Sequence, residues 1–142
     1  MWNDEVSPPE ERYRVRMDRE IVGFLRVMNG KSNFFSRDGF WWTGRPLEFN
    51  IQDEYVGVKD KNNQHIYEWD LVKYKIDPDE PYREGAVLWQ PDRNRFVIRD
   101  IEEDLYYPFD VDGLQMFNPL QLEVFSYLFI NPDLQELWGL SE

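Results

Sequence analysis

The residues that could do chemistry in this chain are almost all carboxylates. It holds 28 Asp and Glu, 16 Lys and Arg, one histidine and no cysteine. The absence of cysteine excludes disulfides, thiolate catalysis and cysteine-ligated metals. His65 would need a nucleophile and an orienting group around it to act in catalysis. Because it lies in a polar turn before Ile66, we interpret it as an exposed turn residue. We identify no catalytic residues and no cofactor, and predict that the protein is not an enzyme.

The carboxylates suggest a calcium loop at one place only. Asp110, Asp112 and Gly113 have the spacing of positions three, five and six of an EF-hand. Positions one and twelve would then be Pro108 and Pro119, neither of which can supply a side-chain ligand. We therefore predict no metal ligands. A looser cation site, or a hydrolase that uses a carboxylate pair, remains as an alternative.

The acidic residues are unevenly distributed along the chain. The net charge is −2 over residues 1–99 and −10 over residues 100–142, where Lys and Arg are absent. Such a surface repels phosphate backbones, so we expect no direct binding of nucleic acid. It either keeps the protein soluble or binds a basic protein partner. The candidate contact residues are Asp100, Glu102, Glu103, Asp104, Asp110 and Asp112.

The aromatic residues Phe40, Trp41 and Trp42 form the densest aromatic cluster. Adjacent residues of a strand face opposite sides, so one of the two Trp side chains is expected to be exposed. An exposed Trp is a common anchor for a protein partner, whereas packing in the core or at an edge is the alternative. Trp41 and Trp42 are therefore candidate partner-binding residues.

A second patterned segment is basic. Arg12, Arg14 and Arg16 alternate with Tyr13, Val15 and Met17, which is typical of a half-buried strand with one charged face. That face could bind phosphate. It could equally pair with the acidic C-terminal region, within the fold or across a homo-oligomer.

The elements that must position these residues are mostly strands. Aromatic residues make up 17% of the chain, which favours β structure. Turn signals recur about every ten residues and predict a small barrel or sandwich. Strands are expected at 12–16, 53–58, 70–76, 84–90, 95–99, 105–109 and 122–129, with residues 21–28 a strand or a short helix, and a hairpin around Asp38-Gly39. One helix is expected after Asn131 as cap, with Pro132 in its first turn and Leu134, Leu137 and Trp138 facing the sheet.

The N-terminal residues do not have the pattern expected of a signal peptide. Residues 1–11 are polar and contain Pro8 and Pro9, so we expect a flexible lead-in and no signal peptide. The longest apolar stretch, Val124–Ile130, is too short to cross a bilayer. We predict a cytoplasmic protein that does not contact a membrane.

Two segments resemble one known family. They are YVGVKDKNNQHIYEWDLVKY at residues 55–74 and LEVFSYLFINPDL at residues 122–134. Together with a hairpin at 85–98, they resemble the YopX family, small and largely uncharacterised proteins of bacteriophages and prophages. The resemblance covers about residues 55–134. The chain departs from the family at Trp69, where the family has a glycine that would allow a positive φ, and at Asn63, which replaces the turn glycine.

The resemblance implies a β-rich fold with a small SH3-like barrel and a phage-like origin. We therefore predict a mainly-β (β-rich α+β) domain over residues 12–142, with an N-terminal β extension at 12–50, a barrel-like part at 51–142 and a short C-terminal helix. The predicted function is non-enzymatic binding of a host or phage protein. The alternative is an acidic inhibitor that mimics nucleic acid against a host defence or DNA-handling protein.

Overall fold

The computed structural model describes residues 11–38 and 41–140. The predicted lead-in lies outside the described residues apart from Glu11, and so do Gly39 and Phe40 of the predicted hairpin. The fold is mainly β, with 52% of the described residues in strands and 9% in helices, as the sequence predicts. The chain divides into two compact units between Gln52 and Asp53, which we call the N-terminal unit and the C-terminal unit.

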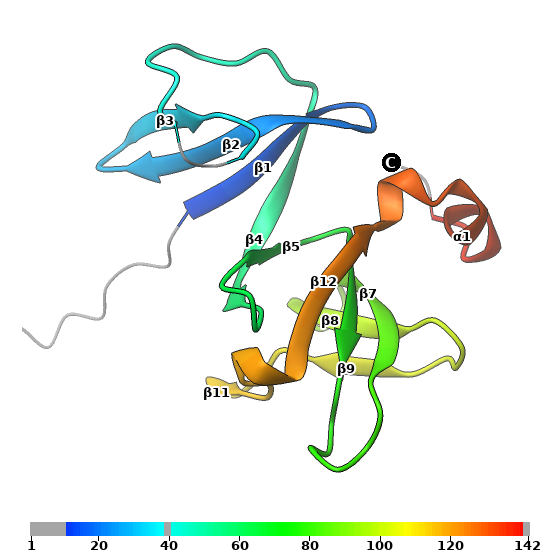
Figure 1. The fold of residues 1–142 in the computed structure, drawn as a ribbon. Coiled ribbons are helices and arrows are strands. Elements are labelled where there is room, and N and C mark those ends of the chain that lie inside the picture. Colours follow the sequence, from blue (N-terminus) through cyan, green and yellow to red (C-terminus); the bar gives the residue numbers. More distant parts are fainter. Residues whose placement is uncertain (1–10, 39–40, 141–142) are drawn as a thin grey trace, which may run out of the picture. The chain divides into compact units, whose positions relative to one another are not determined.

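The N-terminal unit contains an antiparallel meander (Figure 1). Its strands are β1 (Glu11–Met17), β2 (Glu20–Met28) and β3 (Lys31–Phe35). Asn29 and Gly30 join β2 to β3 with φ angles of 52° and 75°. Two consecutive positive φ angles are what a tight two-residue hairpin turn requires, and Asn-Gly is the pair that adopts them most readily.

The charged face predicted on β1 is not open to solvent. Arg14, Val15 and Arg16 are consecutive and all buried, with Arg14 2% and Arg16 0% exposed. Because consecutive residues of a strand point to opposite faces, both faces of β1 are covered here. Met17, expected inside, is instead 42% exposed. A buried guanidinium must be paired, and Arg16 donates from Nη1 to the Asp18 carbonyl at 2.6 Å. The interpretation of β1 as a basic, phosphate-binding face is therefore wrong.

The C-terminal unit is built on one antiparallel sheet with the order β12-β6-β7-β8-β9. These strands are β6 (Asp70–Tyr74), β7 (Arg83–Gln90), β8 (Arg95–Asp100), β9 (Tyr106–Pro108) and β12 (Leu122–Tyr127). The end of β4 (Ile51–Lys59) pairs with β5 (His65–Tyr67), and β10 (Asp110–Val111) pairs with β11 (Leu114–Gln115). No sheet of the described residues closes on itself, so the predicted SH3-like barrel is not confirmed.

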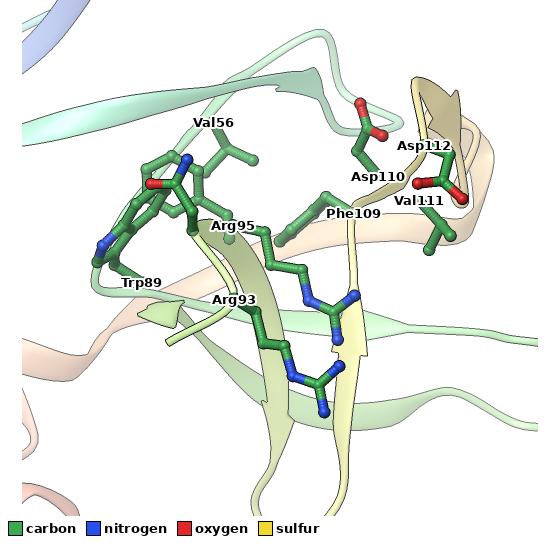
Figure 2. Close-up of a pocket in the computed structure, with 10 residues that line it drawn as sticks. Val56, Trp89, Arg93, Arg95, Phe109, Asp110, Val111 and Asp112 are labelled. Atoms are coloured by element: carbon green, nitrogen blue, oxygen red, sulfur yellow. The ribbon is translucent and has the colours of Figure 1, made fainter. Parts of the chain in front are cut away.

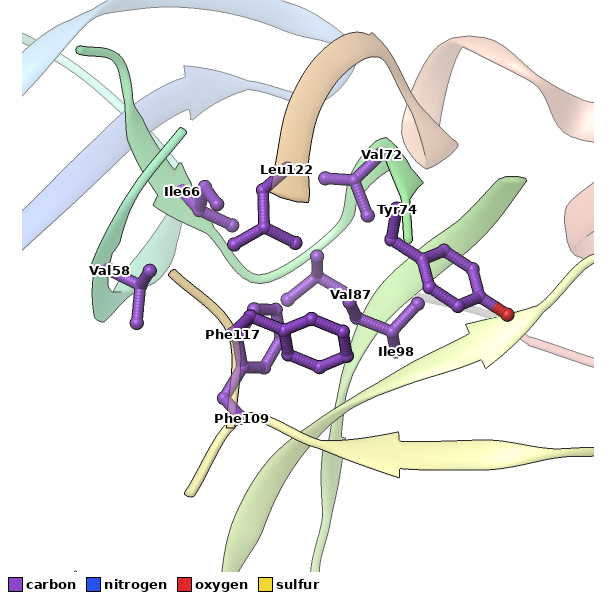
Figure 3. Close-up of a cluster of buried hydrophobic side chains, with 9 residues drawn as sticks. All are labelled: Val58, Ile66, Val72, Tyr74, Val87, Ile98, Phe109, Phe117 and Leu122. Carbon is purple, nitrogen blue, oxygen red and sulfur yellow. The ribbon is translucent and has the colours of Figure 1, made fainter. Parts of the chain in front are cut away.

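The core of the C-terminal unit is a cluster of branched aliphatic and aromatic side chains (Figure 3). It gathers residues from strands and connecting segments far apart in the sequence, namely Val58, Ile66, Val72, Tyr74, Val87, Ile98, Phe109, Phe117 and Leu122. Val72 and Tyr74 alternate with exposed or half-buried lysines, the period-2 pattern that predicted β6. This alternation explains why the strands of this unit were predictable.

The short helical elements follow β11 and β12. They are the 3-10 turns η1 (Pro119–Gln121) and η2 (Leu128–Ile130) and the helix α1 (Pro132–Leu137). Strand β12 ends at Tyr127, earlier than predicted. No helix in the described ranges is long and apolar enough to cross a membrane.

Helix α1 begins with Pro132 and is followed by Gly139 at a φ of 66°, as predicted. Two details differ. The Asn131 side chain does not cap the helix, because its Nδ2 donates to the Tyr127 carbonyl at 2.6 Å and to Ser126 Oγ at 3.2 Å. Leu134 and Trp138 pack on a second cluster of Leu71, Ala86 and Leu128, whereas Leu137 is 75% exposed. Only part of the expected apolar face therefore meets the sheet.

Trp69, immediately before β6, adopts a left-handed conformation with a φ of 75°. Its N–H donates to the Val87 carbonyl at 2.8 Å, and its own carbonyl accepts from the Leu128 N–H at 2.7 Å. Its ring packs against the second cluster. The backbone geometry that a glycine would allow is thus present with a tryptophan, held by hydrogen bonds on both sides. Asn63, the other departure, also has a positive φ, of 64°.

Candidate functional site

Trp41 and Trp42, in the N-terminal unit, both point into solvent. Trp41 is 71% and Trp42 68% exposed, whereas the alternation of a strand predicts only one exposed ring. Within the described residues, this segment pairs with β3 at a single bridge, Phe35 to Trp42. With so short a pairing, neither ring is enclosed.

The backbone that carries these rings is nevertheless well held. The Ser36 N–H donates to the Trp41 carbonyl at 2.7 Å, and the Trp41 N–H donates to Ser36 Oγ at 3.2 Å. On the other side, the Thr43 N–H donates to the Phe34 carbonyl at 2.9 Å. Thr43 Oγ1 also donates to the Arg45 carbonyl at 2.6 Å. The two rings are therefore presented from an ordered backbone.

Asp100, predicted to lie on an acidic surface, is buried and has a structural role. It is 5% exposed, and it accepts hydrogen bonds from the Tyr74 hydroxyl, the Glu102 N–H at 2.8 Å and the Glu103 N–H at 3.0 Å. Burial by itself would raise the pKa of Asp100, but these hydrogen bonds and the nearby Arg83 lower it below its ordinary value. Burial and the bond to Asp100 raise the pKa of Tyr74. Asp100 thus organises the turn after β8 and cannot contact a partner.

The three acidic residues that follow Asp100 are on the surface. Glu102, Glu103 and Asp104 are all exposed in the connection between β8 and β9. Asp104 lies 3.8 Å from the Arg99 guanidinium, with 81% of its side chain still exposed. Together with Asp110 and Asp112, these three carboxylates form the exposed part of the predicted acidic surface.

Asp110 and Asp112 belong to the hairpin of β10 and β11. Asp112 and Gly113 have φ angles of 52° and 82°, and Asp110 Oδ1 accepts from the Gly113 N–H at 2.8 Å. The calcium-like spacing is therefore that of a tight turn. The signal for this hairpin was the Asp-Gly pair between Val111 and Leu114, which the strand prediction left out.

The hairpin of Asp110 and Asp112 lines a cavity of about 470 Å³ in the C-terminal unit (Figure 2). The other walls come from β4 and from the turn and strands of the β7–β8 hairpin. They include the aromatic pair Trp89 and Phe96 and the two basic residues Arg93 and Arg95. The sequence did not single out these four residues, because no motif links residues 89–96 to residues 109–112.

His65 is not in an exposed turn as predicted. It begins β5, is half-buried, and its ring meets that of Tyr55 edge-on at 4.9 Å. The residue that organises the preceding turn is Asp60, which accepts from the N–H groups of Asn62, Gln64 and Val124 at 2.9 Å each. Among the described residues, no group of three or more His, Asp or Glu is arranged to hold a metal ion.

The geometry therefore offers three distinct places for binding: the exposed tryptophans, the three exposed carboxylates after Asp100, and the cavity beside Asp110. Comparison of the chain with known proteins finds no matching family model and no similar curated protein. The function must accordingly be argued from these surfaces.

Proposed function

We propose that the chain is a non-enzymatic protein-binding module whose contact surface is centred on Trp41 and Trp42. The observation that carries the proposal is the exposure of both rings, 71% and 68%, on a backbone that is hydrogen-bonded to Phe34 and Ser36 on either side of them. Tryptophan is among the residues most enriched at the energetic centres of protein interfaces. An ordered backbone also lowers the entropy that is lost on binding.

These two rings can contribute a large free energy of binding. A tryptophan can bury roughly 150–250 Å² in a contact, worth roughly 4–6 kcal/mol at about 25 cal/mol per Å². Since about two-thirds of each residue is still exposed, roughly 3–4 kcal/mol per ring is available before the costs of association. Loss of either ring should therefore cost about 2 kcal/mol, or about 30-fold in Kd.

The proposal extends to origin and location. The resemblance of residues 55–134 to the YopX family supports a phage or prophage protein, whose partner is then a host or phage protein. A chain without cysteine suits a reducing compartment such as the cytoplasm. A second copy of the chain is the simplest alternative partner for the same surface.

The test compares variants in affinity capture from a bacterial lysate, followed by mass spectrometry and measurement of Kd for the recovered protein. The test variants are Trp41→Ala, Trp42→Ala and the double variant, and Leu137→Ala is the matched control because Leu137 is 75% exposed elsewhere. We expect the partner to bind wild type and the control equally and each single Trp variant about 30-fold more weakly. A partner that binds the double variant as well as wild type would refute the role of this surface. Sedimentation of wild type and double variant identifies self-association.

The exposed carboxylates favour a second candidate, an acidic inhibitor that occupies the nucleic-acid site of a host protein. Glu102, Glu103 and Asp104 are consecutive and exposed, in a region of the sequence without Lys or Arg. Binding to a basic partner through them should weaken steeply with salt. Reversal of all three charges to lysine should abolish it, whereas Trp41→Ala should have little effect. Salt-independent binding would exclude this candidate.

A further inference from the structure

The cavity beside the β10–β11 hairpin combines three kinds of chemistry. Trp89 and Phe96 form an aromatic wall, with ring centroids 4.8 Å apart and planes at 69°. The side chains of Arg93 and Arg95 run side by side next to this wall (Figure 2). The carboxylates of the hairpin form the opposite wall. An aromatic face, two cations and carboxylates therefore line one space of about 470 Å³.

Within the described part of the chain, the charged side chains that line this cavity do not form ion pairs. Arg95 donates from Nε to Gln90 Oε1 at 3.1 Å, which orients the side chain and leaves both terminal nitrogens available. Among the described residues, neither Arg93 nor Arg95 forms an ion pair, although Asp110 and Asp112 line the same cavity. Asp110 uses only Oδ1, for the Gly113 N–H. Donors and acceptors thus face the space without neutralising each other.

We propose that this cavity binds a nucleoside monophosphate. A phosphate monoester carries a charge of about −1.5 to −2 at neutral pH, which two guanidinium groups balance, and arginine binds phosphate in a bidentate manner. The planar base stacks on the Trp89 ring, which is 38% exposed. The N–H groups on the edge of the base donate to the carboxylates of Asp110 and Asp112. The volume is within the roughly 300–1,000 Å³ of small-ligand sites.

The charge of the chain favours a free nucleotide over the end of a nucleic-acid strand. The net charge is −12, and a polyanion that enters the cavity would have to approach the carboxylates of Asp110 and Asp112 along several of its phosphates. A single phosphate meets only the two arginines. This inference is independent of the proposed function, because the cavity residues belong to the C-terminal unit and Trp41 and Trp42 to the N-terminal unit.

The test is titration calorimetry of the full chain with AMP, GMP, CMP and UMP at low salt. The expected result is saturable binding of at least one of them, weakened at least tenfold by Arg93→Gln and by Arg95→Gln. Arg45→Gln makes the same change of charge at an exposed residue outside the cavity and should leave Kd unchanged. Asp110→Asn keeps Oδ1 as acceptor for the Gly113 N–H, so it preserves the hairpin while it weakens recognition of the base several-fold. Far-UV circular dichroism checks the fold of each variant.

Two further probes identify the ligand class. The matching nucleoside and inorganic phosphate should each bind at least tenfold more weakly than the nucleotide. The nucleoside lacks the phosphate that the arginines bind, and inorganic phosphate lacks the base. A short single-stranded oligonucleotide of the same base should bind no more tightly than the nucleotide. Absence of saturable binding up to 5 mM of every nucleotide, a strong effect of Arg45→Gln, or tighter binding of the oligonucleotide would each overturn the proposal.

Discussion

The left-handed backbone conformation of Trp69 reverses the usual effect of a glycine substitution on the stability of the protein. At an ordinary position, replacing alanine with glycine destabilises a protein by roughly 0.5–1 kcal/mol, because glycine loses more conformational freedom on folding. Trp69 has a φ of 75°, a conformation that costs an L-residue with a Cβ roughly 1–2 kcal/mol. The variant with glycine at this position should therefore be more stable than the variant with alanine.

The size of the change in the free energy of unfolding follows from the packing of the Trp69 ring and the strain of its backbone. Removal of a fully buried tryptophan costs roughly 3–5 kcal/mol. Because Trp69 is only half-buried on the second cluster, Trp69→Ala should cost about 2 kcal/mol. The backbone strain remains in this variant. Trp69→Gly loses the same packing but relieves the strain. We expect Trp69→Gly to be more stable than Trp69→Ala by about 0.5–1 kcal/mol.

Trp138 provides the matched control. It packs on the same cluster and is half-buried as well, but its φ is −93°. There alanine should be more stable than glycine by about 0.5–1 kcal/mol. The difference between the two positions isolates the strain of Trp69, about 1–2 kcal/mol.

The assay is urea unfolding of the four variants, followed by far-UV circular dichroism because each substitution removes one of the six tryptophans and so changes the fluorescence signal. With an m-value of about 2 kcal/mol per molar, the strain corresponds to a difference in midpoint of about 0.5–1 M. If alanine is the more stable residue at both positions, by the same amount, the reasoning about the Trp69 backbone is refuted.

Two further predictions concern buried carboxylates. The pKa of Asp100 is lowered in the fold, so its ionised form stabilises the protein above pH 4 or so, and this stability is lost as the pH falls through the lowered pKa. Asp100→Asn should therefore be less stable at pH 7 and show a smaller loss of stability from pH 5 to pH 2 in thermal melts; equal losses would contradict the role of Asp100. Asp60→Ala should cost about 2–4 kcal/mol in urea unfolding, because three backbone N–H groups lose a charged acceptor. Asp60→Asn should be intermediate, because its Nδ2 cannot accept from the Val124 N–H; an Asn variant as unstable as the Ala variant would show that the hydrogen bonds are not the cause.

The candidate sites were predictable only where a local pattern pointed to them. Trp41 and Trp42 stand out by type, and the acidic loop stands out by charge. The burial of Asp100 was not predictable, because nothing in the sequence says that the Tyr74 hydroxyl and two N–H groups converge on it. Arg93 and Arg95 were missed for the same reason: their significance depends on a hairpin that lies more than ten residues further along the chain.

The sequence by itself determined the mainly-β fold, most of the strands, the Asn29-Gly30 turn and the position of α1. These depend on periodicity and on turn chemistry, which act between neighbours in the chain. The tertiary structure decided which faces are covered. It buried Arg14 and Arg16 on a strand that was expected to be half-exposed, and left both Trp41 and Trp42 in solvent. It also held Trp69 in a glycine-like conformation through hydrogen bonds to Val87 and Leu128. Burial and backbone strain depend on residues brought together from distant segments, so no local pattern could show them.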